Sequence, residues 1–301
     1  MFVRTWIPES KPIAVLHIVH GMAEHSGRYE RFAQSLIKSG IAVWAADMRG
    51  HGKTADLSVN GARRGGLMGH CADKNGDQRV SEDIDILNRR ITETYPDIPF
   101  FLMGHSWGSF LVQNYLEQYR YPLAGAILSG TRGPDGIKIA ISVPLMQVIS
   151  FVKGTRNTSR FARSLADGSL NNAFKPNRTP YDWISRDHAE VDRYAADPLC
   201  KNLCSAGFYR DMALLLERIH RSENLQKIPK NLPVYIFSGA SDPVGDNGVG
   251  PSKLANIYRA LGIKDLELVL YPGARHETLN ETNYAEVTKN VLDWILRHIK
   301  P

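Results

Sequence analysis

The chain has 301 residues, enough for one large α/β domain or for a domain with an insertion. Its hydrophobic fraction of 43% suits a soluble globular core, and we expect no apolar run to reach the roughly 20 residues of a membrane span. The N-terminal residues lack the charged-then-apolar layout of a secretory signal. The three cysteines, Cys71, Cys200 and Cys204, are too few for a disulfide framework and predict a reducing, cytoplasmic location.

The net charge of +6 is concentrated in one part of the chain. Residues 131–180 carry eight cations and two acids, a balance of +6, so the rest of the chain sums to about zero. A basic surface attracts anionic lipid or nucleic acid, or is simply solvated. We predict peripheral contact between this segment and an anionic membrane, and no nucleic-acid partner.

Apolar runs alternate with helical patterns from the N-terminus onward. We predict strands over residues 2–6, 13–20, 41–46, 99–103, 123–128, 233–237 and 266–271. Helical periodicity lies between them, over residues 29–39, 81–94, 107–119, 252–261 and 283–299. Strands rich in Val, Ile, Leu and Phe that alternate with helices predict an α/β fold with a mainly parallel sheet flanked by helices.

The alternation stops between residues 131 and 205. An apolar run over 137–152, interrupted by Lys138 and Pro144, is followed by a stretch rich in Arg, Asn and Ser. We therefore predict a core formed by residues 1–130 and 206–301, with residues 131–205 inserted as a mostly helical cap (the cap segment).

The pentapeptide Gly104-His105-Ser106-Trp107-Gly108 fits the pattern Gly-x-Ser-x-Gly and stands between a predicted strand and a predicted helix. A serine on such a tight turn is held clear of the backbone, so that its Oγ can attack a carbonyl carbon. The two glycines keep Cβ atoms out of the crowded turn. The pattern in this context predicts Ser106 as a nucleophile.

A serine nucleophile needs a histidine base and a carboxylate that orients it, and on this type of sheet the chain order is Ser, acid, His. Asp242 and His276 each follow a predicted strand after Ser106, and the carboxyl ends of parallel strands share one edge. Asp246 competes with Asp242 as the acid. The chain order disfavours the remaining candidate histidines, which precede or adjoin Ser106: His20, His25, His51, His70 and His105.

The oxyanion of the tetrahedral intermediate needs backbone N–H donors. One is expected from Trp107, directly after the nucleophile, and another from the loop after an early strand, where Met22 follows His20-Gly21. This chemistry needs neither a cofactor nor a metal. A zinc site at Cys200 and Cys204 is disfavoured because no second Cys/His cluster accompanies the pair.

With these residues in place, the chain resembles the monoglyceride lipase and lysophospholipase-like group (serine aminopeptidase S33 type) of the α/β-hydrolase superfamily. The resemblance covers nearly the whole chain and is carried by residues 20–29, 47–52, 104–108, 239–242 and 273–276. It implies an eight-stranded core with a cap inserted after the sixth strand. It also implies Asp242 rather than Asp246 as the acid, and Met22 and Trp107 as oxyanion donors.

Three positions depart from this family. Only one strand has room before residue 13, where the family usually starts with a hairpin, so the first edge strand is expected to be absent or to precede this sequence. Ser109 replaces a common glycine. Leu279 stands where monoglyceride lipases have a second histidine, whereas Glu24, Arg28 and Tyr194 match polar positions of the family's substrate pocket. A lost polar partner predicts weaker recognition of glycerol.

We therefore predict a serine ester hydrolase that acts on monoacyl lipid-like esters, of monoacylglycerol or lysophospholipid type, through an acyl-enzyme. The alternatives are a short-chain carboxylesterase or an aminopeptidase of the same fold. An aminopeptidase needs an acidic cluster for the substrate amine, to which only Glu24 is placed to contribute. A non-catalytic binding protein on this scaffold is disfavoured by the complete set of catalytic residues.

Overall fold

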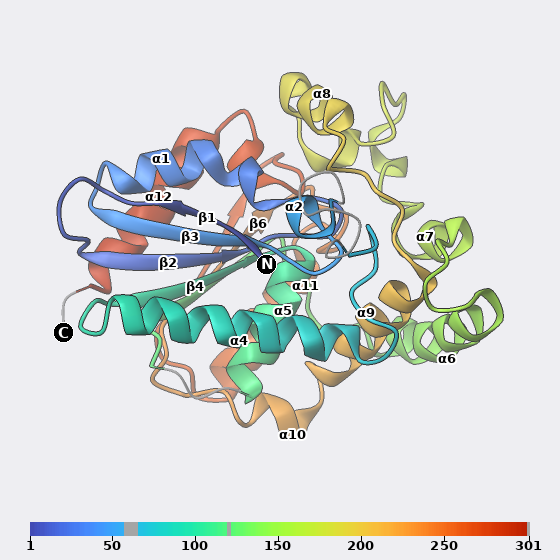
Figure 1. The fold of residues 1–301 in the computed structure, drawn as a ribbon, viewed down its shortest axis with the longest axis horizontal. Coiled ribbons are helices and arrows are strands. Elements are labelled where there is room, and N and C mark those ends of the chain that lie inside the picture. The colour runs from blue at the N-terminus through green and yellow to red at the C-terminus, as the bar shows by residue number, and fades with distance from the viewer. Residues whose placement is uncertain (57–65, 119–121, 300–301) are drawn as a thin grey trace.

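The computed structural model describes residues 1–56, 66–118 and 122–299. Within them a seven-stranded sheet runs through the molecule in the order β1-β3-β2-β4-β5-β6-β7 (Figure 1). β1 pairs antiparallel with β3, and every other pairing is parallel. The strands are β1 Phe2–Trp6, β2 Ala14–Val19, β3 Ile41–Asp47, β4 Phe100–His105, β5 Gly125–Ser129, β6 Val234–Gly239 and β7 Leu266–Tyr271.

Helices cover both faces of this sheet because neighbouring residues of each strand point to opposite sides. Phe101 and Met103 of β4 belong to the same buried cluster as Trp294 of α12, whereas Leu102 belongs to the cluster on the other face. One face carries α1 (Glu30–Ile37) and α12 (Tyr284–Arg297); the other carries α4 (Gly76–Thr94), α5 (Trp107–Gln118) and α11 (Val249–Ala260).

The seven strands and five helices predicted from the sequence all appear, with ends shifted by up to five residues. The last residue of the predicted helix over 107–119, Tyr119, lies outside the described residues. The eight strands that the resemblance implied are not all present, because the described part of the chain has one strand before β2. The insertion consequently follows β5, the fifth strand of this chain rather than the sixth.

Seven further helical segments lie between β5 and β6: α6 Gly136–Lys153, α7 Arg160–Asp167, η2 Asn172–Phe174, η3 Asp182–Ile184, α8 His188–Ala196, α9 Ala206–Arg218 and α10 Ser222–Leu225. The helices α6 and α7 project beyond the sheet at the right of Figure 1, and α8 lies at the top; α9 packs against both α6 and α5. Most of these helical segments lie within the predicted cap segment. The domain boundaries at residues 131 and 205 stay a prediction.

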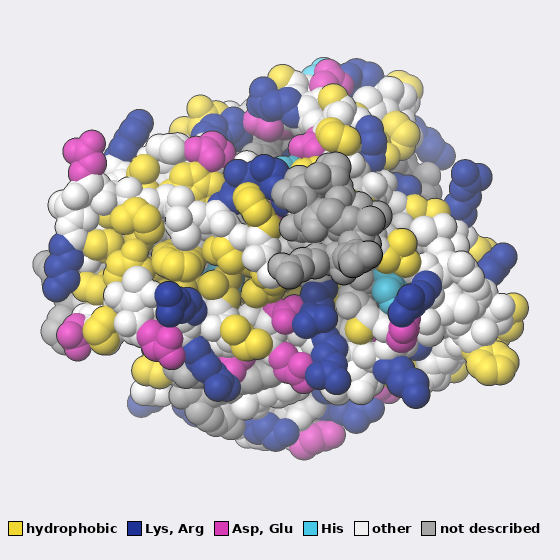
Figure 2. All heavy atoms as spheres, viewed as in Figure 1, with side chains coloured by type: hydrophobic (Ala, Val, Ile, Leu, Met, Phe, Trp, Pro, Cys, Tyr) yellow, Lys and Arg dark blue, Asp and Glu magenta, His cyan; other side chains and the backbone are white. Residues whose placement is uncertain are grey.

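α6 bears on the prediction that no apolar run reaches the roughly 20 residues of a membrane span. By length and composition alone this helix of 18 residues could cross a bilayer, and 22% of it is buried. Lys138 and Pro144 interrupt the apolar run in the sequence, but both lie within one continuous helix. Hydrophobic and basic side chains both appear at the right-hand edge of the surface, where α6 and α7 lie (Figure 2).

The sheet brings the sequence-predicted site residues to one edge. β4 ends directly before Ser106, β6 ends three residues before Asp242, and β7 ends five residues before His276. Because these three strands run parallel, their carboxyl ends lie on the same side of the sheet.

Candidate active site

Ser106 occupies the sharp turn between β4 and α5 and has a φ of +52°. This left-handed conformation is costly for a residue with a side chain. A Cβ on Gly104 would collide with the carbonyl oxygen of Gly108, and a Cβ on Gly108 would collide with that of Val19. Glycine is therefore required at both positions for the strand, the turn and the helix to pack so closely.

Hydrogen bonds hold the turn in this conformation. The amide of Ser106 donates to the carbonyl of Ser129 at 2.9 Å. The hydroxyl of Ser109 donates to the carbonyl of Ser106 at 2.6 Å and lies 2.8 Å from the hydroxyl of Thr131, from which it can accept. The serine at position 109, where the family commonly has glycine, thus supports the turn directly.

His276 and Asp242 form a buried pair. Nδ1 of His276 lies 2.9 Å from Oδ2 of Asp242, and both side chains are at most 3% exposed. Asp242 also accepts hydrogen bonds from the amide of Val244 at 2.9 Å and from the hydroxyl of Ser238 at 3.1 Å. Asp246, the alternative acid, makes no side-chain hydrogen bond within the described residues, and the geometry therefore selects Asp242 as the partner of His276.

The pair is electrostatically suited to hold a proton on the imidazole. Burial favours a lower pKa for His276, but the adjacent Asp242 outweighs it and raises that pKa above its ordinary value. Burial likewise favours a higher pKa for Asp242, and the charge and hydrogen bond of His276 reverse the effect and lower it. Asp242 therefore stays ionised and stabilises the imidazolium form of His276.

Ser106 and His276 line one cavity of about 410 Å³. Among the residues described, no hydrogen bond joins the two, as is common before a substrate tightens such a contact. His105 packs against His276 with ring centroids 4.9 Å apart, and Trp183 packs at 5.1 Å. These rings pack against the imidazole in the cavity that Ser106 also lines.

Two backbone amides are available beside Ser106. Trp107 is the first residue of α5 and Met22 lies in the loop after β2; neither amide has an acceptor in the described part of the chain. The loop of Met22 is held by His20, whose Nε2 accepts from the amide of Met48 at 3.0 Å. Nδ1 of His20 therefore carries the proton and donates to the carbonyl of Gly21 at 2.8 Å. The two amides can serve as oxyanion donors.

A buried ionic network lies beside the pair. Arg28 donates to both carboxylate oxygens of Glu277 at 2.6 Å each and to Glu24 at 3.2 Å. Glu24 also accepts from the amide of Gly21 and from the hydroxyl of Tyr29 at 2.9 Å. Burial works against the charge of Glu24, but Arg28 outweighs it and lowers the pKa of Glu24 to about 2. The network joins the loop of Met22 to the loop of His276.

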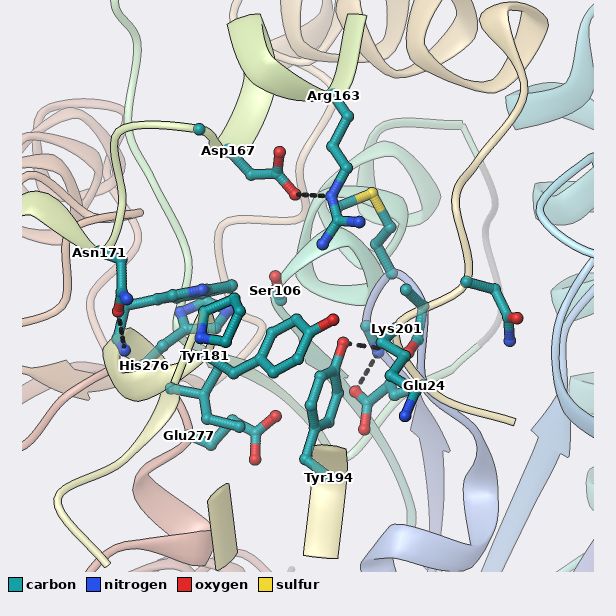
Figure 3. Close-up of a pocket in the computed structure, with 18 of the residues that line it drawn as sticks. Glu24, Ser106, Arg163, Asp167, Asn171, Tyr181, Tyr194, Lys201, His276 and Glu277 are labelled. Carbon is teal, nitrogen blue, oxygen red and sulfur yellow. Dashed lines mark hydrogen bonds and ion pairs between the residues drawn. The ribbon is translucent and has the colours of Figure 1, made fainter. Parts of the chain in front are cut away.

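The cap segment contributes to the cavity on both sides of Ser106 (Figure 3). Arg163 and Asp167 of α7 lie on one side, and Tyr194 of α8 lies on the other with Glu24 and Glu277. The hydroxyl of Tyr194 donates to the carbonyl of Ala23 at 3.3 Å, and its ring faces the guanidinium of Arg28 at 4.8 Å.

The sequence-predicted substrate residues fall into two groups. Glu24 and Tyr194 line the main cavity, whereas Arg28 and Leu279 line a much smaller adjacent one together with Glu277. Leu279 is buried and is not among the residues that line the main cavity. Sequence reasoning missed Glu277, Arg163 and Lys201 as cavity residues; the position of Glu277 directly after His276 was the one local signal available.

Three potential metal ligands, His25, Asp197 and Cys200, lie within 4.8 Å of one another. His25 Nδ1 accepts from the amide of Gly27, so Nε2 carries the proton and donates to Asp197 at 2.9 Å. Burial raises the pKa of the Cys200 thiol, which opposes the thiolate form that metals bind. The hydrogen bond between His25 and Asp197 is enough to explain why these residues lie together, because it links the Met22 loop to the cap segment.

A family model described as "Serine aminopeptidase, S33" matches residues 10–283. The chain is 28% identical to a monoacylglycerol lipase of Mycolicibacterium smegmatis, over 98% of this chain and 92% of the relative. It is 33% identical to a phospholipase, YtpA, of Bacillus subtilis, over 95% of each chain.

The chain is also similar to a protein of known structure. A thermostable carboxyl esterase from Bacillus coagulans, determined in complex with glycerol, superposes with a TM-score of 0.89 at 30% identity, over 99% of this chain and 94% of the esterase. The agreement extends over both the sheet and the insertion.

Proposed function

Because the chain belongs to the serine aminopeptidase S33 family of α/β hydrolases and is a serine ester hydrolase, we propose that it cleaves monoacyl lipid-like esters through a Ser106–His276–Asp242 triad. The observation that carries the proposal is the buried His276–Asp242 pair, 2.9 Å apart, in a cavity shared with Ser106. The relatives named as monoacylglycerol lipase and phospholipase support a monoacyl lipid as the substrate class.

In the proposed mechanism His276 removes the proton of Ser106 as its Oγ attacks the ester carbonyl. The amides of Met22 and Trp107 donate to the oxyanion that forms. His276 then gives its proton to the departing alcohol, which leaves an acyl group on Ser106. Water, activated by His276, releases the acyl group as a carboxylic acid, and Asp242 keeps the imidazole oriented throughout.

The proposal is tested with nitrophenyl esters of rising acyl length and with a monoacylglycerol. We expect Ser106→Ala to reduce turnover to the background rate. Asp242→Asn should lower kcat by about 10⁴-fold, because it removes the group that orients His276 and stabilises its positive charge. A preference for longer acyl chains separates a lipid-ester hydrolase from a short-chain carboxylesterase.

Asp246→Asn is the matched control, since it makes the same change four residues away at a side chain that does not contact His276. It should keep kcat within a few-fold of the wild-type value. Equal losses in the two variants would contradict the role of Asp242, and turnover that survives Ser106→Ala would contradict the nucleophile.

We also propose that residues 131–205 form a lid that rests on an anionic membrane. The apolar side of α6 supports this, since Ile137 is 79% and Phe151 is 88% exposed. Five of the eight cations of residues 131–180 are paired with acids; Lys153, Arg160 and Lys175 have no ionic partner in the described part of the chain. Apolar side chains flanked by unpaired cations are the composition of interfacial segments. The protein in this proposal is cytoplasmic and peripherally bound.

A further inference from the structure

We propose that the cap wall of the active-site cavity binds a phosphate group carried by the substrate, through Arg160 and Arg163. The cap wall is the set of polar residues from α7 and the segment directly after it that line this cavity: Arg160, Arg163, Ser164, Asp167, Asn171, Asn172 and Asn177. The inference rests on the proposed function and narrows its substrate class to monoacyl esters with a phosphate-bearing headgroup.

A cavity that accepts only an acyl chain and a glycerol would need few charges. The cap wall instead presents two cations, Arg160 and Arg163, and one acid, Asp167. Arg163 and Asp167 lie one helical turn apart on α7, with the guanidinium 3.4 Å from the carboxylate. Three asparagines and one serine complete the wall. The side-chain amides of Asn171 and Asn177 each donate one hydrogen bond to a backbone carbonyl, and each has a second N–H.

The positive charge of the cap wall is only partly offset. Burial raises the pKa of Asp167, and Arg163 opposes this effect. Arg160 has no ionic partner among the described residues. Lys201 lies beside Glu24 in Figure 3, and its ammonium group donates to the carbonyl of Ala195, so it is not part of this wall. Arg160 therefore leaves the cap wall with one positive charge that no acid offsets.

The acids on the opposite wall of the cavity, Glu24 and Glu277, already accept hydrogen bonds from neighbouring groups. Both oxygens of Glu277 accept from Arg28, and Glu24 accepts from Arg28, Tyr29 and Gly21. This network carries one excess negative charge on its own side of Ser106, away from Arg163 (Figure 3). An anionic group in the cavity is therefore favoured at the cap wall and disfavoured at the wall formed by the core.

Phosphate is the anion that suits these groups. The planar guanidinium of an arginine donates two parallel hydrogen bonds to a pair of phosphate oxygens. Arg163 is 36% exposed, which leaves its guanidinium accessible from the cavity while it stays in contact with Asp167. A phosphate held there would lie across the cavity from Glu24 and Glu277, with Ser106 between them.

The experiment compares two substrates that differ only in the phosphate: a short-chain 1-acylglycerol and the corresponding 1-acylglycerol 3-phosphate, both kept below their micellar concentrations. We expect wild type to prefer the phosphate ester in kcat/KM. Arg163→Gln should lower the ratio of the two kcat/KM values by roughly 10- to 100-fold, the effect expected of a lost charge-assisted hydrogen bond. Arg160→Gln, at an exposed and unpaired side chain, should lower it in the same direction without risk to folding.

Arg156→Gln is the control, because Arg156 pairs with Asp73 outside the cavity and carries the same charge on the same segment. It should leave the ratio unchanged. An unchanged ratio in both Arg160→Gln and Arg163→Gln would overturn the inference, as would a wild-type preference for the neutral ester.

A binding measurement separates this inference from the proposed mechanism. With Ser106→Ala protein, calorimetry should show that the phosphate ester binds more tightly than the neutral ester. The addition of Arg163→Gln should remove this difference in affinity. If neither ester is cleaved by wild type but this difference persists, the mechanism fails and the phosphate site stands. If inorganic phosphate binds as tightly as the phosphate ester, the site binds a free ion and the assignment of the substrate class is overturned.

Discussion

At the scale of single residues, the site consists of polar groups that form hydrogen bonds with other groups of the protein. Ser106 accepts an unfavourable φ because the carbonyl of Ser129 and the hydroxyl of Ser109 bind its backbone. Strain of this kind costs on the order of 1–3 kcal/mol and persists where the surroundings enforce it. Its benefit here is a hydroxyl presented to the cavity rather than to the backbone.

One buried carboxyl has no such partner. Glu117 of α5 is 1% exposed, and neither carboxylate oxygen makes a hydrogen bond in the described part of the structure. Burial, only partly opposed by Arg218, raises its pKa to about 9. In the unfolded chain the group titrates near 4.5, so between pH 4.5 and 9 unfolding releases a proton that the folded protein retains. Its contribution to stability is complete below pH 4.5 and is lost as the pH rises toward 9.

We therefore expect Glu117→Gln to flatten the dependence of stability on pH. In wild type this group lowers the free energy of unfolding with rising pH, by at most about 1.4 kcal/mol per pH unit. Urea unfolding at several values between pH 6 and 9 measures the slope. Glu93→Gln makes the same change at an exposed carboxyl and should keep the wild-type slope. A Glu117→Gln protein with the same slope as wild type would show that Glu117 is ionised in the fold.

At the scale of elements, α6 has two different sides. Ile139, Met146 and Ile149 are buried where α6 packs against α9, whereas the other side exposes large apolar residues. These exposed residues are Ile137, Ile141, Leu145, Val148, Phe151 and Val152. Contiguous apolar surface of this kind marks a site of contact with a membrane or another partner. Its place on the insertion, next to unpaired cations, favours the membrane.

Replacement of two of these side chains tests the membrane contact. Ile137→Ser combined with Phe151→Ser removes two highly exposed apolar groups, and we expect sedimentation with anionic vesicles to fall by at least 10-fold, since each buried methylene contributes about 0.8 kcal/mol. Ile86→Ser is the control, because Ile86 is 61% exposed on α4. Wild-type binding should also weaken with added salt. Sedimentation that is insensitive to both the double substitution and salt would count against the contact.

At the scale of the whole molecule, segments far apart in sequence meet beneath the cavity. The Arg28–Glu277 pair joins residues 249 positions apart, and His25–Asp197 joins the core to the cap segment over 172 positions. The amide of Lys201 adds a second such link by donating to the carbonyl of Ala23 at 2.9 Å. The loop that holds Met22 is therefore positioned by the loop of His276 and by the cap segment together.

We expect loss of the Arg28–Glu277 pair to weaken the whole fold. Glu277→Gln leaves the buried Arg28 with Glu24 as its remaining acid, and the free energy of unfolding should fall by about 3 kcal/mol. Urea denaturation measures the loss. The control is Glu267→Gln, which breaks the exposed pair with Arg297 and should cost less than about 1 kcal/mol. Equal and small losses in the two variants would mean that the buried network contributes little to stability.

The sequence by itself determined the sheet, its flanking helices and the order of Ser106, Asp242 and His276 along it. It could do so because strand and helix periodicity are local, and because parallel strands must bring their carboxyl ends to one edge. The turn glycines at 104 and 108 were readable for the same reason: the pattern reflects steric limits within five residues.

Only the tertiary structure decided which groups face one another. The choice of Asp242 over Asp246, the pairing of Glu277 with Arg28, and the presence of Arg163 and Lys201 in the cavity depend on contacts between distant segments. Likewise, the apolar run of 137–152 did not reveal which of its side chains α9 would cover. Burial, and with it the pKa of a group such as His276 or Glu117, is a property of the assembled molecule, because it depends on which atoms replace water around the group.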